Sequence, residues 1–375
     1  MANQWNPHFL DPSRYQSPLD FIARRTHFAD HIAPIWNELK DYPQRGKFYV
    51  PAFLQEYVES LGCTDVVGLT HPTNSMLIVP PGRGPILASA QGDLIQASRN
   101  RGGRPYMLME HGVGIVFPKF SGYAGGLGMR RYVSLFLSPN ETIAKKTLAT
   151  FPTAFQRVVG TPKLDEWAIP RKPNKALEKT HKPVIAISFH WDGKAVAPEA
   201  GNAYAHYKDI VPELSKYYHV LGHGHPRIID QFAPIWESHG FEVVRDFREV
   251  MARADLYIND CSSTLYEFLV TGRPVLILNA PWFRRNINYG IRFWDYTDIG
   301  FQVEKPEELL ERIKVALIHD LHKEARDKTV SELYPHLGYS AKRTAGTIAE
   351  FIDKVSTGNV QKFGDPWVYK KQEKP

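Results

Sequence analysis

The sequence predicts an α/β fold made of two doubly wound domains. Short apolar runs, typical of buried strands, alternate with helical segments through both halves of the 375-residue chain. Such alternation predicts parallel sheets assembled from βαβ units. A polar, basic, proline-flanked stretch at residues 169–183 separates the two halves and has the composition of a domain linker. The chain length also fits two domains of about 100–200 residues each.

In the first half, apolar residues at helical spacing predict a helix within residues 18–43. Pro51 and Gly62 mark the beginning and the end of the next helix, and Asn140 is the expected N-cap of a later one. A further helix is expected over residues 92–103. Strands are expected at 47–51, 65–70, 75–80, 85–89, 104–112, 131–139 and 155–167, the last with a turn.

The second half repeats the pattern. Strands are expected at 184–192, 218–227, 241–246, 255–261, 274–279 and 300–304. Helices are expected at 207–216, 247–254, 263–272, 306–326 and 341–356. These elements predict a first domain, a linker, a second domain and a C-terminal helix with a polar tail, at residues 1–168, 169–183, 184–339 and 340–375.

Composition narrows the class of protein. The two cysteines, Cys63 and Cys261, are too few for a disulfide framework, which favours a reducing compartment. No apolar run approaches the roughly 20 residues of a membrane span, and the start of the chain has no signal-peptide pattern. We therefore expect a cytoplasmic protein. A net charge of +6 and a pI of about 9.0 suit an anionic ligand, a membrane surface or nucleic acid.

A polar cluster follows the expected strand 255–261. It consists of Asp260, Ser262, Ser263 and Thr264. Ligands of doubly wound sheets bind beyond the carboxyl ends of strands, and a helix that begins there offers unpaired N–H groups to phosphate. Glu267, one turn further on, is placed to reach ribose hydroxyls. The alternative is ordinary helix capping, with Glu267 and Thr264 forming a capping box.

Polar residues interrupt the chain at three other expected strand ends. They are Glu110 and His111 in the first domain, and His190, Trp191, Asp192, His223, His225 and Arg227 in the second. A single such histidine is more often a structural hydrogen bonder. Several groups at the same edge of a sheet predict a shared site, and they favour a nucleotide diphosphate site over simple capping.

The segment ADLYINDCSSTLYEFLVTGRPVLIL, residues 254–278, resembles the signature of CDP-glycerol:polyol glycerophosphotransferases and their glycosyltransferase relatives. The MEHGVG, HVLGHGHPR and GTPKLD segments resemble other loops of that family. Cys261 departs from it, because the family has an aromatic residue there. His223 stands where many members carry lysine, and Lys163 replaces an arginine.

This resemblance spans about residues 105–350 and implies a GT-B architecture, in which two Rossmann-like domains flank a cleft. The second domain of such proteins binds the donor and the first binds the acceptor. A final helix typically crosses back to the first domain, and residues 340–355 fit that helix.

The expected chemistry is transfer of a glycosyl or polyol-phosphate group from a nucleotide diphosphate, such as a UDP-sugar or CDP-glycerol, to a hydroxyl. His111 is the candidate base because imidazole titrates near neutral pH, and Asp192 competes for that role. The predicted donor-binding residues are His190, His223, His225, Arg227, Asp260, Ser262, Ser263, Thr264 and Glu267. The sequence has no D-x-D pattern and no zinc-ligand spacing, so we expect neither a metal nor a cofactor. The glycine-rich stretch 123–131 either approaches a substrate or is a surface loop.

Other functions stay open at this point. One is a glycosyltransferase that modifies hydroxylated bases in DNA, and another is a nucleotide-sugar 2-epimerase-like enzyme that needs no second substrate. A third is a non-catalytic nucleic-acid binding protein, which is disfavoured because the basic residues are dispersed. The acceptor is therefore a glycan, a polyol phosphate or a modified DNA base, and peripheral membrane contact is compatible with the charge.

Overall fold

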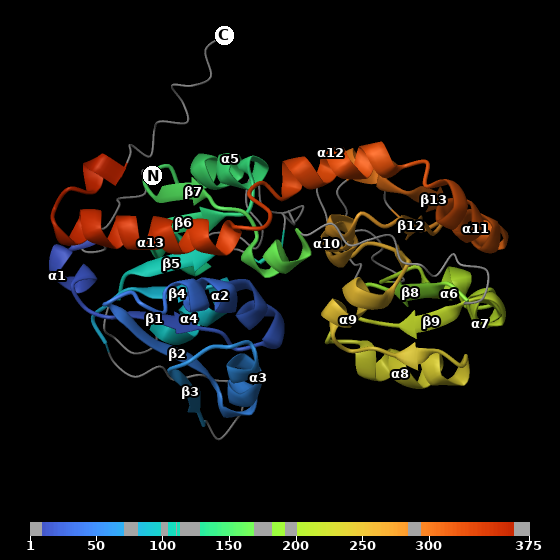
Figure 1. The fold of residues 1–375 in the computed structure, drawn as a ribbon, viewed down its shortest axis with the longest axis horizontal. Helices are drawn as coiled ribbons and strands as arrows, with labels where there is room; N and C mark the ends of the chain where they lie inside the picture. Colours follow the sequence, from blue (N-terminus) through green and yellow to red (C-terminus); the bar gives the residue numbers. More distant parts are fainter. Residues whose placement is uncertain are drawn as a thin grey trace, which may run out of the picture. The chain divides into compact units, whose positions relative to one another are not determined.

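The computed structural model describes residues 10–70, 82–98, 104–109, 111–112, 128–168, 182–191, 201–283 and 294–363. The chain divides into two compact units (Figure 1). The first comprises Met1–Gly114, Gly125–Glu166 and Leu333–Pro375, and the second comprises Ile115–Ala124 and Trp167–Glu332. Each unit contains one sheet, and every strand pair recorded in the two sheets is parallel. The predicted α/β class with two doubly wound sheets is thereby confirmed.

The sheet of the first unit has seven strands in the order β3-β2-β1-β4-β5-β6-β7. In chain order they are β1 Leu19–Ile22, β2 Arg45–Pro51, β3 Val66–Leu69, β4 Ile86–Ala88, β5 Tyr106–Met109, β6 Val133–Ser138 and β7 Phe155–Val158. The sequence reversal at β1 and β4 is the topological switch point of a doubly wound sheet. Loops beyond the carboxyl ends of β1 and β4 are therefore the expected place for a ligand.

One element of this unit differs from the sequence expectation. Residues 18–43 were expected to be helical, but they form β1 and then α2 Thr26–Glu38. All four residues of β1 are buried, because the strand pairs with β2 on one side and β4 on the other. The strand has only four residues and one of them is the charged Asp20, so its apolar residues are too few to distinguish a strand from the helix that follows.

The helices of the first unit begin and end largely where the sequence predicts. They are α1 Pro12–Tyr15, α2, α3 Gln55–Ser60, α4 Gln91–Ser98, α5 Glu141–Thr150 and α13 Ser340–Ser356. The Asn140 side chain accepts a hydrogen bond from the Ile143 N–H at 3.0 Å, which confirms the predicted N-cap. Helix α13 lies beside α1 and α2, and its Ile348 and Phe351 are fully buried in the core of this unit (Figure 1).

The second unit has six strands in the order β10-β9-β8-β11-β12-β13. They are β8 Val184–Ser188, β9 His219–Gly222, β10 Glu242–Val243, β11 Leu256–Asn259, β12 Val275–Leu278 and β13 Phe301–Val303. Renumbered within the unit, this order is 3-2-1-4-5-6, the same as in the first six strands of the first unit. The switch point here lies between β8 and β11.

The helices of the second unit depart from expectation at three places. They are α6 Tyr204–Tyr207, α7 Leu214–Tyr217, α8 Ile229–Ser238, α9 Phe247–Arg253, α10 Thr264–Phe268, α11 Leu309–His319 and α12 Lys323–Leu333. The single helix expected at 306–326 is two helices, because Asp320 adopts a left-handed conformation with φ of 39° and accepts from the Arg326 guanidinium. The helix expected at 207–216 is also broken. Helix α8 was not expected.

Candidate functional site

The predicted donor residues of the second unit gather where β8, β9 and β11 end. His190 and Trp191 follow β8, His223 and His225 follow β9, and Asp260 follows β11. These three strands are neighbours in the sheet and run parallel, so their carboxyl ends share one edge. The residues that the sequence analysis grouped by strand end are thus brought together around the switch point.

Asp260 ties the loops of this edge to one another. Its Oδ1 accepts from the backbone N–H groups of His190 (2.9 Å) and Cys261 (2.7 Å), and its Oδ2 accepts from the Ala203 N–H (3.0 Å). The residue is fully buried. A carboxylate whose oxygens already hold three backbone donors acts chiefly by fixing those loops, which differs from the direct donor contact that the sequence predicts.

A second network fixes the start of α10. Asn259 donates from Nδ2 to the Ser188 carbonyl at 3.1 Å, and its Oδ1 accepts from the Ser262 N–H at 2.7 Å. The Ser262 Oγ accepts from the Thr264 N–H at 3.3 Å and from its hydroxyl at 2.9 Å. The sequence analysis did not single out Asn259, although its place at the last position of a buried strand was a usable signal.

Ser263 and Glu267 complete this segment. Ser263 is half-buried and stands at the N-cap position of α10, but its side chain makes no capping hydrogen bond. The alternative of a capping box between Thr264 and Glu267 is not what the structure has, because Ser263 rather than Thr264 occupies the N-cap position. Glu267 is 5% exposed. Glu267 is therefore a buried residue in the first turn of α10, and its predicted contact with the ribose stays a prediction.

The two histidines after β9 present different ring nitrogens. His223 is buried and its Nδ1 lies 2.8 Å from the Val244 carbonyl, which can only accept, so Nδ1 carries the hydrogen. Burial lowers the pKa of His223, which keeps the ring neutral near pH 7. In His225 the Nδ1 instead accepts from the Arg227 N–H at 3.1 Å, so the neutral ring has its N–H at Nε2. That N–H is a suitable donor to a phosphate oxygen.

An aromatic and cationic cluster lies beside these histidines. The Arg227 guanidinium stacks on the Trp191 ring at 4.1 Å from the ring centroid. The His225 ring lies 5.7 Å from that of Trp191 and 6.4 Å from that of His190. Arg227 is exposed, whereas His190 is 6% exposed. The cluster offers one exposed cation next to a flat indole, a combination that suits an anionic ligand with a planar base.

In the first unit, His111 lies beyond the carboxyl end of β5. Its Nδ1 donates to the Ser89 carbonyl at 2.7 Å, and Ser89 follows β4. This hydrogen bond fixes the tautomer in which Nε2 is the basic nitrogen. His111 is exposed, and its ring lies 4.7 Å from that of Phe28. The predicted base is therefore held in an orientation that leaves Nε2 as the proton-accepting nitrogen of the neutral ring.

Two further histidines accompany His111 that the sequence analysis did not identify. The His111 ring lies 6.0 Å from that of His27 and 6.3 Å from that of His31, both on α2. His31 is 2% exposed, and burial, followed by the charges of Lys163, His111 and His27, lowers its pKa well below the usual value. Their spacing within an ordinary amphipathic helix gave no signal, because only folding brings α2 against the loop after β5.

Some predicted residues lie outside the described residues. They are Asp192, Glu110, the strand 75–80, most of the linker 169–183 and most of the stretch 123–131. Among the residues that are described, no group of three or more His, Cys, Asp or Glu side chains is arranged to hold a metal ion. Within the same residues, no helix combines the length and apolarity needed to cross a membrane. The metal-free mechanism stays a prediction.

Comparison with solved structures gives the fold of the whole chain. The wall teichoic acid polymerase TagF matches at 13% identity and a TM-score of 0.60, covering 94% of this chain and 91% of that one. The S. aureus MnaA–UDP structure matches at 14% identity and a TM-score of 0.60, covering 90% and 97%. The UDP-GlcNAc 2-epimerase from Neisseria meningitidis, bound to UDP-GlcNAc, matches at 13% identity and a TM-score of 0.56, covering 89% and 100%. The predicted GT-B-like fold is confirmed.

The comparisons by sequence match a shorter part of the chain than the structural ones do. No curated protein matches the chain. The family model described as "CDP-Glycerol:Poly(glycerophosphate) glycerophosphotransferase" matches residues 180–353. That span contains the ends of β8, β9 and β11 with all the described donor-side residues, and it confirms the resemblance carried by the motif at 254–278. Residues 180–353 are therefore similar to the glycerophosphotransferase family, and the whole chain has the GT-B-like fold of TagF.

Proposed function

We propose that the protein transfers a glycerophosphate-type group from a CDP-glycerol-type donor to a hydroxyl acceptor. The observation that carries this proposal is the family match over residues 180–353, which contains the polar edge of the second unit. The fold by itself does not choose between functions, because a wall teichoic acid polymerase and a UDP-GlcNAc 2-epimerase match it with TM-scores of 0.60 and 0.56. The family match favours transfer over the epimerase-like alternative.

The donor phosphates are assigned to the edge beyond β8, β9 and β11. The Nε2–H of His225, the Arg227 guanidinium and the Ser263 hydroxyl are the donors that this edge offers to phosphate oxygens. The exposed cation–indole pair of Arg227 and Trp191 is suited to hold a base against a phosphate. Asp260 and Asn259 hold the loops after β8 and β11, which carry Trp191 and Ser263, through hydrogen bonds to the backbone.

The reaction then balances as follows. The oxygen of the acceptor hydroxyl attacks the distal phosphorus of the donor, and the bond from that phosphorus to the bridging oxygen breaks. Glycerophosphate becomes linked to the acceptor as a phosphodiester, and CMP leaves. The hydroxyl proton passes to Nε2 of His111, whose tautomer is fixed by Ser89. Donors of hydrogen bonds at the phosphates stabilise the charge on the leaving nucleotide.

Product analysis tests this function directly. The chain is incubated with CDP-glycerol or UDP-GlcNAc and with glycerol phosphate as the hydroxyl acceptor, and ³¹P NMR follows the products. Formation of CMP and a new phosphodiester is expected. UDP release would instead indicate glycosyl transfer, and an isomerised sugar nucleotide without nucleotide release would indicate an epimerase.

A parallel set of reactions contains a chelator of divalent metal ions. We expect CDP to bind and CMP to form at unchanged rates, because hydroxyl, imidazole and guanidinium groups are proposed to hold the phosphates. Binding that requires added Mg²⁺ or Mn²⁺ would overturn the metal-free mechanism.

A further inference from the structure

The first unit contains a cavity of about 610 Å³ at the opposite edge of its sheet. Its described lining comes from the amino ends of β1, β2, β3, β4 and β5 and consists of Ser17, Pro18, Asp20, Arg45, Gly46, Lys47, Tyr49, Asp65, Gly82, Arg83, Gly84 and Arg104. Arg104 precedes β5 and His111 follows it. The two therefore lie at opposite ends of β5, so the cavity is distinct from the candidate active site.

A buried ion pair forms the floor of this cavity. Arg104 donates from Nη2 to the Asp20 Oδ2 at 2.6 Å, and these side chains are 6% and 12% exposed. The Arg104 Nε donates to the Gly84 carbonyl at 2.7 Å, and the Asp20 Oδ1 accepts from the Lys47 N–H at 2.8 Å. No described residue accepts a hydrogen bond from the Arg104 Nη1, and that atom is not sealed off by protein. It is a guanidinium donor directed at the cavity.

The wall carries a second, less buried set of charges. Asp65 accepts from the Arg45 Nη2 at 2.8 Å and from the Lys47 Nζ at 2.9 Å. Hydrogen bonds from Lys47 and then Arg45 are the main causes that lower the pKa of Asp65, so it stays ionised. The Arg45 guanidinium also stacks over Trp36 at 4.6 Å. Both carboxylates of the lining are therefore already engaged by cations.

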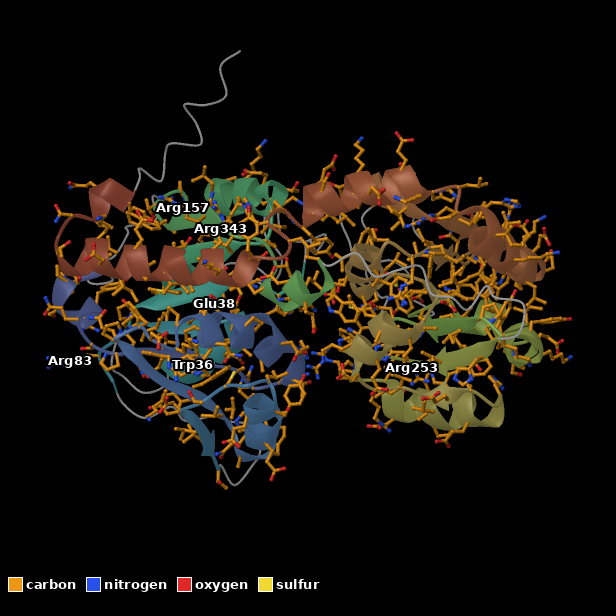
Figure 2. All side chains as sticks on the ribbon, viewed as in Figure 1. Trp36, Glu38, Arg83, Arg157, Arg253 and Arg343 are labelled. Carbon is orange, nitrogen blue, oxygen red and sulfur yellow. The ribbon has the colours of Figure 1, made fainter. Side chains whose placement is uncertain are left out.

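Arg83 adds a cation without a described partner. It is exposed and lies at the margin of the first unit, whereas Trp36 lies inside it (Figure 2). The lining thus holds four cations, Arg45, Lys47, Arg83 and Arg104, and two carboxylates, which leaves a net charge of +2. Because the cations outnumber the carboxylates, the cavity attracts anions and disfavours a metal cation.

Glycines keep this cavity open. A Cβ on Gly84 would lie 2.0 Å from the Pro18 carbonyl oxygen, and one on Gly46 would lie 2.2 Å from the Asp20 Oδ1. A Cβ on Gly82 would lie 2.9 Å from the Arg104 Nη1, the atom that faces the cavity. The absence of a side chain at position 82 therefore leaves the guanidinium donor uncovered.

We propose that this cavity is a second anion site, which binds the phosphate group of a small phosphorylated molecule. The Arg104 Nη1, the Lys47 ammonium and the Arg83 guanidinium supply the donors, and the Tyr49 hydroxyl lies in the same lining. Arginine matches the geometry of phosphate oxygens, and the volume lies within the roughly 300–1,000 Å³ of small-molecule sites. The site goes beyond the proposed transfer reaction, since it lies at the other edge of the sheet.

Calorimetric titration with inorganic phosphate at constant ionic strength tests the site. Saturating CDP is present throughout, so that the proposed donor site is already occupied. We expect one saturable phosphate site per chain and about tenfold weaker binding in Arg83→Glu, which reverses one contacting charge. The matched control, Lys342→Glu on α13, makes the same charge change at an exposed residue and should bind as the parent does. No phosphate binding in the presence of CDP, or equal weakening in the control, overturns the proposal.

A second variant tests the Arg104 donor without changing any charge. Gly82→Ala places a methyl group against Nη1 and should weaken phosphate binding several-fold with little change in melting temperature. Gly346→Ala is the control, because a Cβ there meets no atom within 4 Å. Glycerol 3-phosphate and glycerol serve as further probes, and only the phosphorylated one should compete with phosphate. Unchanged binding in Gly82→Ala would contradict the assignment of Arg104.

Discussion

The two units share a strand order but place different chemistry at the same edge of the sheet. In the first, the loops after β4 and β5 meet through the hydrogen bond from His111 to the Ser89 carbonyl, and the His111 imidazole lies near those of His27 and His31 on α2. In the second, the loops after β8 and β11 are held by Asp260, the hydroxyls follow β11, and the Arg227 guanidinium follows β9. The comparison teaches that topology supplies the edge, whereas side chains decide whether that edge accepts a proton or donates to an anion.

The largest effect on activity should come from a substitution in the first unit. His111→Ala removes the proposed base, so turnover should fall by about 10²–10⁴-fold. Nucleotide affinity should change little, because the proposed phosphate contacts belong to the second unit. Rates of CMP release and calorimetric titration with CDP measure the two quantities. His219→Ala, which alters an exposed histidine paired with Glu242, is the control. Retained activity in His111→Ala together with loss in Asp192→Ala would move the base to the second unit.

Asp260→Asn tests whether the loops at the carboxyl ends of the second unit's strands depend on this carboxylate for their structure. The substitution gives one oxygen position an N–H₂ group that faces a backbone N–H donor in a fully buried place. We expect the free energy of unfolding to drop by about 3 kcal/mol, measured by urea denaturation. Asp230→Asn, on a side chain that is 81% exposed, should change it by less than about 0.5 kcal/mol. Equal stability of both variants would contradict the positioning role.

Removing the hydroxyls of Ser262 and Ser263 at the start of α10 should affect CDP binding and stability to different extents. Ser263 makes no capping bond, so Ser263→Ala should weaken CDP binding by about 1.5–3 kcal/mol, the usual value of a bond to a charged oxygen, with little loss of stability. Ser262→Ala should lower both, because its Oγ accepts twice from Thr264. Calorimetry and thermal denaturation give the two readouts. A double variant that binds CDP as well as the parent would place the phosphate site elsewhere.

The smallest expected effect is the pH dependence of the free energy of unfolding, to which one buried histidine in each unit contributes. Burial lowers the pKa of His31 in the first unit and of His223 in the second. Both stay neutral when folded, whereas the unfolded chain takes up protons as the pH falls below the ordinary value of 6.5. Stability is therefore lost as the pH falls, by about 1 kcal/mol near pH 5.5 for His31, whose pKa lies well below the ordinary value, and by less for His223. His31→Gln and His223→Gln should each show a smaller loss between pH 7 and 5.5 in urea denaturation. An unchanged pH dependence would show that these rings are protonated when folded.

Most strands and helix ends were predictable because their signals are local. Asn140 caps its helix as predicted, and Gly62 ends another with a φ of +82° that other residues seldom adopt. The errors have physical causes. The strand β1 has only four residues, one of them Asp20, and is too short to be distinguished from the helix that follows it. The break at Asp320 depends on its contact with Arg326.

The sequence by itself determined the fold class, the strand ends that carry polar groups and the family motif at 254–278. These depend on periodicity and on residue types that are adjacent in the chain. Only the tertiary structure decided which atoms of those groups are engaged: the three backbone donors on Asp260, the tautomers of His111 and His225, and the cavity around Arg104. Each of these joins segments that are distant in the chain or fixes an orientation, and neither leaves a pattern in the sequence because hydrogen-bond geometry exists only once the strands are paired.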